Sequence, residues 1–286
     1  MAMQKWLLFF ITLLTITASI IWYRSNHQPA RESITYFPIH PELTIREART
    51  EILTGKGQKI LLRTYSHMDT PVFLRQDITM LFANGKLVAK MGKWQQNVKY
   101  LEQSQKVTVK HNTKLHALSF HHAEIHENST IKSTQQITDE IRYLIVTDNE
   151  GVISFKNLVT AEERLWKEML DKKEERVVSS AIDTIAAAYS LDLHHFDLIP
   201  LSDLAKFMHE PLPSFSMSET KIIIGHLIEG LYKNYFLGIK KEDGSTVSPI
   251  NSTVPIIFLA KNREFLYVSF ITADGDVILL RQNISV

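Results

Sequence analysis

An uncharged run near the N-terminus constrains this chain more than any other feature. It extends from Trp6 to Tyr23, reads WLLFFITLLTITASIIWY, and would measure about 27 Å as a helix, close to the thickness of a bilayer core. Aromatic residues lie at both ends, and Lys5 and Arg24 flank the run, as at membrane interfaces. We therefore predict a cytoplasmic tail and a transmembrane signal-anchor within residues 1–23.

A cleaved secretory signal is the main alternative to an anchor. Residues 17–19 are small, as a signal peptidase requires, but the apolar run continues past them through residues 20–22. A buried core helix is a third reading of the same run. We expect the anchor to stay attached. The localisation would then be the cell membrane, single-pass, with the bulk of the chain extracytoplasmic and the N-terminal helix in contact with lipid.

Composition excludes several classes of function. The chain has 32 Lys and Arg against 31 Asp and Glu, so no basic surface charge favours nucleic acid. Ten glycines in 286 residues are about half the average share, which argues against glycine-rich phosphate loops. The absence of cysteine excludes disulfides, thiolate metal sites and cysteine nucleophiles. We expect no nucleic-acid partner and no nucleotide partner.

The residues after the anchor change character at about residue 57. Prolines and polar residues predict a stalk in the segment 24–56. Within it, Ile45, Ala48 and Ile52 have helical spacing, which predicts a short amphipathic helix over 42–54.

Residues 57–157 have the pattern of a β-rich extracytoplasmic domain. Short apolar runs alternate with polar turns, and Asn84-Gly85 is a typical hairpin turn because both residues tolerate positive φ. We expect an antiparallel sheet or a small barrel. The predicted strands are QKILLRTYSH, PVFLRQDITMLF, KLVAKMGKW, NVKYLE, KVTVKHN, KLHALSFHHAEIH, IRYLIVT and VISFKN.

Residues 158–286 predict an α+β extracytoplasmic domain. Thr160 with Glu163, and Ser216 with Glu219, have the spacing of capping boxes at the start of helices. Three apolar runs near the C-terminus then predict a three-stranded β-meander. The expected fold class is α+β: a transmembrane helix, a β-rich antiparallel half, a helical segment and the meander.

His122, Glu124 and His126 are the candidate metal ligands. On a strand, residues two apart share a face, so these side chains would lie in line, and imidazole and carboxylate are ligands for zinc, manganese or iron. A solvated end of a hairpin strand explains the same pattern without metal, and we favour it. We therefore expect no cofactor and name no catalytic residue, with a divalent transition metal as the alternative.

A second pattern, His67 and Asp69 after a predicted strand, resembles the His-x-Asp of the dinuclear zinc aminopeptidase family. That family has a further Asp shared by both metals, and the corresponding stretch here, GKLVAKMGKW, has no carboxylate. A simple turn at Asp69 accounts for these residues.

The function expected from these features is binding or regulation rather than catalysis. The layout of one anchor and an exported part of this size resembles that of bacterial extracytoplasmic families, among them accessory regulators of sensor kinases and envelope or sporulation factors. We predict a membrane-anchored extracytoplasmic protein of a bacterial cell envelope that acts through contacts with a membrane or envelope protein. The alternative is a membrane-tethered metal-dependent hydrolase acting on envelope material.

Overall fold

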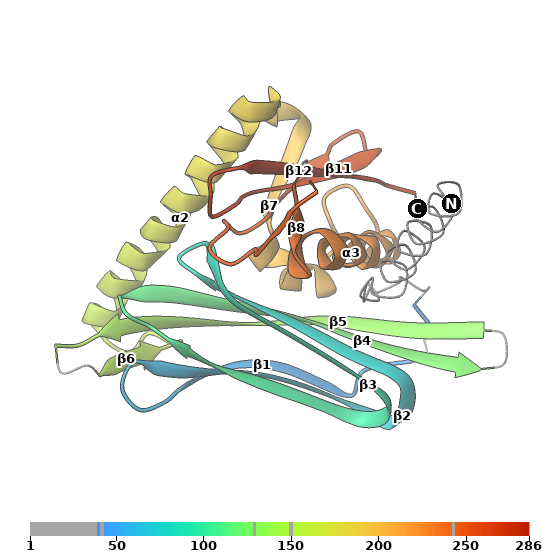
Figure 1. Cartoon of the computed structure of the whole chain (residues 1–286), viewed down its shortest axis with the longest axis horizontal. Helices are drawn as coiled ribbons and strands as arrows, with labels where there is room; N and C mark the ends of the chain where they lie inside the picture. Colours follow the sequence, from blue (N-terminus) through green and yellow to red (C-terminus); the bar gives the residue numbers. More distant parts are fainter. Residues whose placement is uncertain (1–38, 41–42, 128–129, 149–150, 242–243, 286) are drawn as a thin grey trace, which may run out of the picture. The chain divides into compact units, whose positions relative to one another are not determined.

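A computed structural model of the chain has a β-rich antiparallel architecture with helices and a C-terminal meander-like sheet (Figure 1). Among the described residues, no helix is both long and apolar enough to cross a bilayer, and the predicted anchor lies outside them. The structure describes residues 39–40, 43–127, 130–148, 151–241 and 244–285.

The first sheet contains six strands that all pair antiparallel. Their order is β1-β2-β4-β5-β6, with β3 pairing along β2. The turn between β2 and β3 is the predicted Asn84-Gly85, with φ angles of 47° and 79°. The strands are β1 (Glu47–Thr54), β2 (Lys59–Ala83), β3 (Lys86–Thr108), β4 (Thr113–Glu127), β5 (Thr130–Val146) and β6 (Val152–Phe155).

Strand β2 is long enough to form part of two layers of the first sheet. Its first part, residues 60–67, pairs with β1, and its last part, residues 74–83, pairs with β4. The ladder to β3 shifts register between His67 and Val72, where the ribbon of β2 and β3 turns back on itself. Two predicted strands are therefore one continuous β2, and the layers face each other as a sandwich.

Two helices in the second part of the chain start at the predicted capping boxes. Thr160 and Glu163 cap α2 (Ala161–Tyr189), and Ser216 and Glu219 cap α3 (Met217–Leu231). The predicted meander is β10 (Ile256–Ala260), β11 (Phe265–Ile271) and β12 (Val277–Asn283). The sequence missed a fourth strand of this sheet, β7 (Phe196–Pro200), which pairs with β10. The remaining elements are η1 (Leu193–His195), η2 (Leu201–Met208), η3 (Tyr232–Phe236), β8 (Ile239–Lys240) and β9 (Thr246–Val247).

One hydrophobic cluster includes side chains from both parts of the chain. From the first sheet it contains Ile78, Phe82, Leu118 and Phe120, and these pack with α3 and with the C-terminal sheet. A second cluster lies inside the sandwich, between the two layers. We call the layer formed by the last part of β2, β4 and β5 the inner layer. Its face away from the sandwich interior is therefore covered by the helices and the second sheet.

The helix predicted over residues 42–54 is wrong, because Glu47–Thr54 forms strand β1. Helical spacing of Ile45, Ala48 and Ile52 was a misleading signal. Thr50 and Ile52, two residues apart, are both buried between the layers, which is the period of a strand. Pairing with β2 along the whole of β1 outweighs the local helical pattern.

Candidate functional site

One end of the sandwich interior is polar, which is unusual for a space closed between two sheet layers. At its centre, Arg75 and Asp77 lie two residues apart on β2, and both side chains are fully buried. Nη2 of Arg75 is 3.3 Å from Oδ1 of Asp77. We call this region the polar interior; its members are Thr50, Thr64, Ser66, Arg75, Asp77, Thr79, Ser119 and His121, each no more than 5% exposed.

The carboxylate of Asp77 is in contact with three other side chains. The Ser66 hydroxyl donates to Oδ2 of Asp77 at 2.5 Å, and Arg75 donates to the same hydroxyl and to the carbonyl of His122. Nδ1 of His121 lies 3.3 Å from Oδ2 of Asp77, at ion-pair distance but without hydrogen-bond geometry. The carboxylate is thus held by one guanidinium, one hydroxyl and one imidazole.

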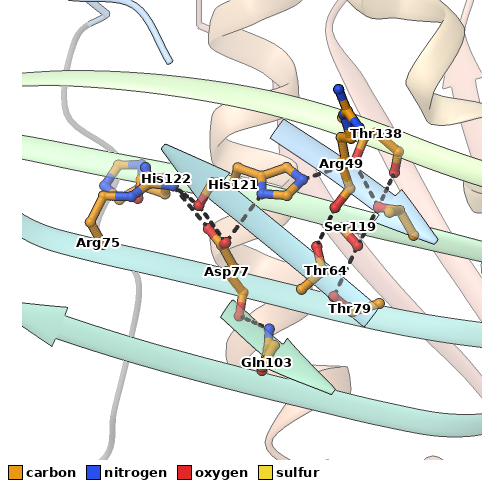
Figure 2. Close-up of polar contacts among 12 residues, drawn as sticks. Arg49, Thr64, Arg75, Asp77, Thr79, Gln103, Ser119, His121, His122 and Thr138 are labelled. Carbon is orange, nitrogen blue, oxygen red and sulfur yellow. Dashed lines mark hydrogen bonds and ion pairs between the residues drawn. The ribbon is translucent and has the colours of Figure 1, made fainter. Parts of the chain in front are cut away.

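A chain of hydroxyl groups continues from His121 across both layers (Figure 2). Nε2 of His121 is 2.8 Å from Oγ1 of Thr138 on β5, and that atom is 2.6 Å from Oγ1 of Thr50 on β1. Thr50 also donates to Ser119, which is 2.9 Å from Thr79. Polar contacts therefore connect a buried ion pair to Thr138, a residue at the surface.

Burial of Arg75 lowers the pKa of its guanidinium, and the nearby charge of Asp77 opposes that shift. A guanidinium stays protonated even so, which means that Asp77 compensates a charge inside the protein. Because Arg75, Asp77 and His121 have no exposed surface, no substrate reaches them in this conformation. Of these three side chains, His121 is the one in contact with the Thr138 hydroxyl.

Thr138 lies in a surface groove of about 690 Å³, which we call the β5 groove. Its walls come from β1, at residues 48–51, and from η2, at residues 202–209, with β5 between them. A second hollow, of about 680 Å³, shares Ile141, Ser202 and Asp203 with it and extends toward α2. Together they follow β5 from Gln136 to Tyr143.

The main chain of β5 has an open edge along this groove. Ser133 accepts a hydrogen bond from His40 on the side away from β4, and β6 pairs on that side only from Tyr143 onward. Successive peptide groups alternate in direction along a strand, and the β4–β5 register has no shift. The N–H and C=O groups of residues 135, 137, 139 and 141 therefore point out of the sheet, and no strand of the described residues pairs with them.

The predicted metal ligands do lie together. Oε1 of Glu124 is 2.9 Å from Nε2 of His122, and Oε2 is 2.9 Å from Nε2 of His126. His122 and Glu124 are buried, and the Phe73 ring stacks on His126 at 3.7 Å. Among the described residues, no group of three or more His, Cys, Asp or Glu side chains is arranged to hold a metal ion. The metal site at these residues stays a prediction.

Glu124 has a lowered pKa. Burial alone would raise the pKa of this carboxyl, but the hydrogen bonds from His122 and His126 outweigh burial and favour the carboxylate. His122, Glu124 and His126 therefore have an explanation without metal, as a hydrogen-bonded group at the end of β4. The second sequence pattern is that of His67 and Asp69. In the structure, Asp69 forms an exposed ion pair with Arg46 at 2.8 Å.

Neither the polar interior nor the open edge of β5 was predicted from the sequence. A usable signal was the pair Arg75 and Asp77 within PVFLRQDITMLF, because two charges on one face of an apolar strand require compensation inside the protein. His121 has no such signal, because its contact with Asp77 depends on the pairing of β2 with β4. The role of Thr138 had no signal, since it depends on contacts between β1, β4 and β5 that only the fold defines.

No protein-family model, no curated protein and no solved structure matches the chain. The geometry of the polar interior and of the β5 groove is therefore the basis for a functional proposal.

Proposed function

We propose that the chain is a membrane-anchored extracytoplasmic protein of a bacterial cell envelope that binds or regulates a partner protein. The β5 groove is the observation that carries this proposal. It is an elongated surface hollow, open along a sheet edge, and a segment of another protein fits such a shape better than a small substrate does. The uncharged run at residues 6–23 supports the anchor.

Site-specific cross-linking tests this proposal. A photoactivatable amino acid placed at Lys206, an exposed position on the η2 wall of the groove, should give a discrete cross-linked protein in native membranes. The same group at Lys172, exposed on α2, is the matched control. Cross-links that are absent at both positions, or equal at both, would contradict binding through the groove.

The second candidate is a membrane-tethered metal-dependent hydrolase that acts on envelope material. The observation in its favour is that the imidazoles of His122 and His126 both contact the carboxylate of Glu124. Elemental analysis of the full chain, purified without chelator, should then find stoichiometric transition metal, and EDTA should lower the Tm. Replacing both histidines by alanine should remove the metal. Metal-free protein whose Tm is unchanged by EDTA would eliminate this candidate.

A further inference from the structure

We propose that the open edge of β5, from Gln135 to Ile141, accepts an extended segment of a partner protein as an added strand, and that this segment carries a lysine or arginine opposite Asp139. The inference rests on the proposed function, because it names the chemistry of the partner that the β5 groove binds.

The edge already accepts extended chain at one end. Ile39 forms a parallel bridge with Ser133, and the N–H of His40 donates to the carbonyl of Ser133 at 2.9 Å. At the other end, β6 pairs with β5 from Tyr143. Between these two points the outward main-chain groups form a ladder about 20 Å long, given about 3.4 Å per residue. Main-chain pairing of this kind is the basis of strand addition.

The walls of the groove decide which kind of strand fits. Residues of β1 line one wall and residues of η2 line the other, so the edge of β5 is recessed between them. A second sheet would bring its own neighbouring strands against these walls. A single extended segment of about seven residues avoids that clash, which favours a partner's tail or loop over the sheet edge of a second copy.

Side chains along the edge define the pattern of the segment. Ile137, Asp139 and Ile141 alternate along β5 and share one face. Residues opposite each other in neighbouring strands contact on one face, so the segment should present apolar, basic and apolar side chains in turn. Only the face of the added strand that lies opposite Ile137, Asp139 and Ile141 has to follow this pattern.

Charge complementarity supports the basic residue. Two other acids of the groove are already neutralised, Glu51 by Arg63 and Glu140 by Arg142 and Lys156. Oδ2 of Asp139 is 3.0 Å from Nε2 of His116, and Oδ1 of Asp203 accepts from the Ser202 hydroxyl at 3.4 Å. Among the described residues, no lysine or arginine lies within ion-pair distance of either carboxylate. The Asp139 side chain is 39% exposed, so it is accessible to a partner.

A defined peptide tests the pattern. The probe is the acetylated, amidated heptapeptide TVTKTVT, which presents Val, Lys and Val on one face, and it is titrated against the full chain in lipid nanodiscs. We expect saturable binding with a Kd below about 1 mM. Replacing Asp139 by lysine (Asp139→Lys) should weaken binding about five- to tenfold and should favour the TVTETVT peptide instead. Asp183→Lys, the same charge change at an exposed position on α2, should leave the Kd unchanged.

Amide hydrogen exchange gives a second readout that does not depend on affinity. In the free chain, the amides of Ile137, Asp139 and Ile141 should exchange faster than those of Thr138 and Glu140, and the probe should slow the first three. No binding at about 1 mM, equal affinity for both peptides, or slow exchange of the three amides in the free chain would each overturn the strand-addition proposal.

The two proposals can fail separately. A discrete cross-link at Lys206 without peptide binding would leave a protein partner in place and reject only the added strand. Peptide binding without any cross-linked protein in native membranes would reject the proposed function.

Discussion

The inner layer of the sandwich has two buried faces with opposite chemistry. Toward α3 and the second sheet, β2 and β4 present Ile78, Phe82 and Leu118, which belong to the large hydrophobic cluster. Toward β1, the same strands present Asp77 and His121, which are completely buried as well. Both faces exclude water. The first is stabilised by buried apolar area and the second by contacts between polar groups, although Nε of Arg75 and Nδ1 of His121 have no hydrogen-bond partner among the described residues.

Substitutions on the two faces should destabilise the fold for different reasons. Removing atoms from the apolar face leaves a cavity, and the cost depends on how far the neighbours collapse into it. Removing one partner from the polar face leaves a charge without compensation, which is costly at any packing density. The polar face therefore favours one arrangement of β1 over the inner layer, and so it determines where Thr50 and Thr138 meet beside the β5 groove.

The largest effect is expected for Asp77→Ala. It removes the one carboxylate that the described part of the chain places at the buried guanidinium of Arg75, which should lower the free energy of unfolding by about 3–5 kcal/mol. Chemical denaturation of the full chain in detergent measures the change. The matched control is the double variant Arg75→Met with Asp77→Leu, which removes both charges and should recover most of the loss. A loss of less than about 1 kcal/mol in the single variant would show that the pair is not desolvated.

A somewhat smaller effect is expected on the apolar face for Leu118→Ala. Leu118 is 2% exposed, and its truncation should cost about 3 kcal/mol through lost burial and a residual cavity. The same denaturation measurement applies, and Leu118→Met should cost less than half as much, since it nearly conserves volume. Equal losses for the two variants would mean that the side chain contributes something other than packing.

The sequence predicts the features of this fold that depend on contacts between residues close together in the chain. Capping boxes at Thr160 and Ser216 and the turn at Asn84-Gly85 depend on residues within a few positions, and all three predictions are confirmed. The turn of the β2–β3 ribbon and the strand character of Glu47–Thr54 depend on partners far along the chain. Alternation within one strand does not reveal whether both faces will be covered.

The candidate site divides in the same way. His122, Glu124 and His126 were predicted to share a face because strand spacing fixes it, and the structure brings them together. The contact between His121 and Thr138 joins residues 17 positions apart across a hairpin, and that of Thr50 with Thr138 joins residues 88 apart. Neither contact follows from local spacing, so the polar interior could not be predicted without knowing how the layers are arranged.

A moderate, pH-dependent effect is expected for Glu124→Gln. The pKa of Glu124 is lower in the fold than its ordinary value near 4.5, so its contribution to stability is present above that value and is lost as the pH falls through the folded pKa. The variant should lose about 1–2 kcal/mol at neutral pH. Denaturation curves between pH 7 and 3 should converge for the variant and the original chain in acid. A difference that does not change with pH would contradict the ionised state of Glu124.

The smallest effect is expected where the polar interior reaches the groove. Thr50→Val and Thr138→Val each remove a hydroxyl from the 2.6 Å contact between β1 and β5, and each should cost about 1 kcal/mol. The two losses should not add, because either substitution breaks the same contact; a double-mutant cycle should give a coupling of about 0.5–1 kcal/mol. The pair Thr64→Val and Thr138→Val is the control, since Thr64 donates to the carbonyl of Arg49 at 3.0 Å and not to Thr138. Coupling in the first cycle alone would show that β1 is held over the β5 groove by this contact, whereas additive losses in both cycles would mean that the two layers are held together by packing.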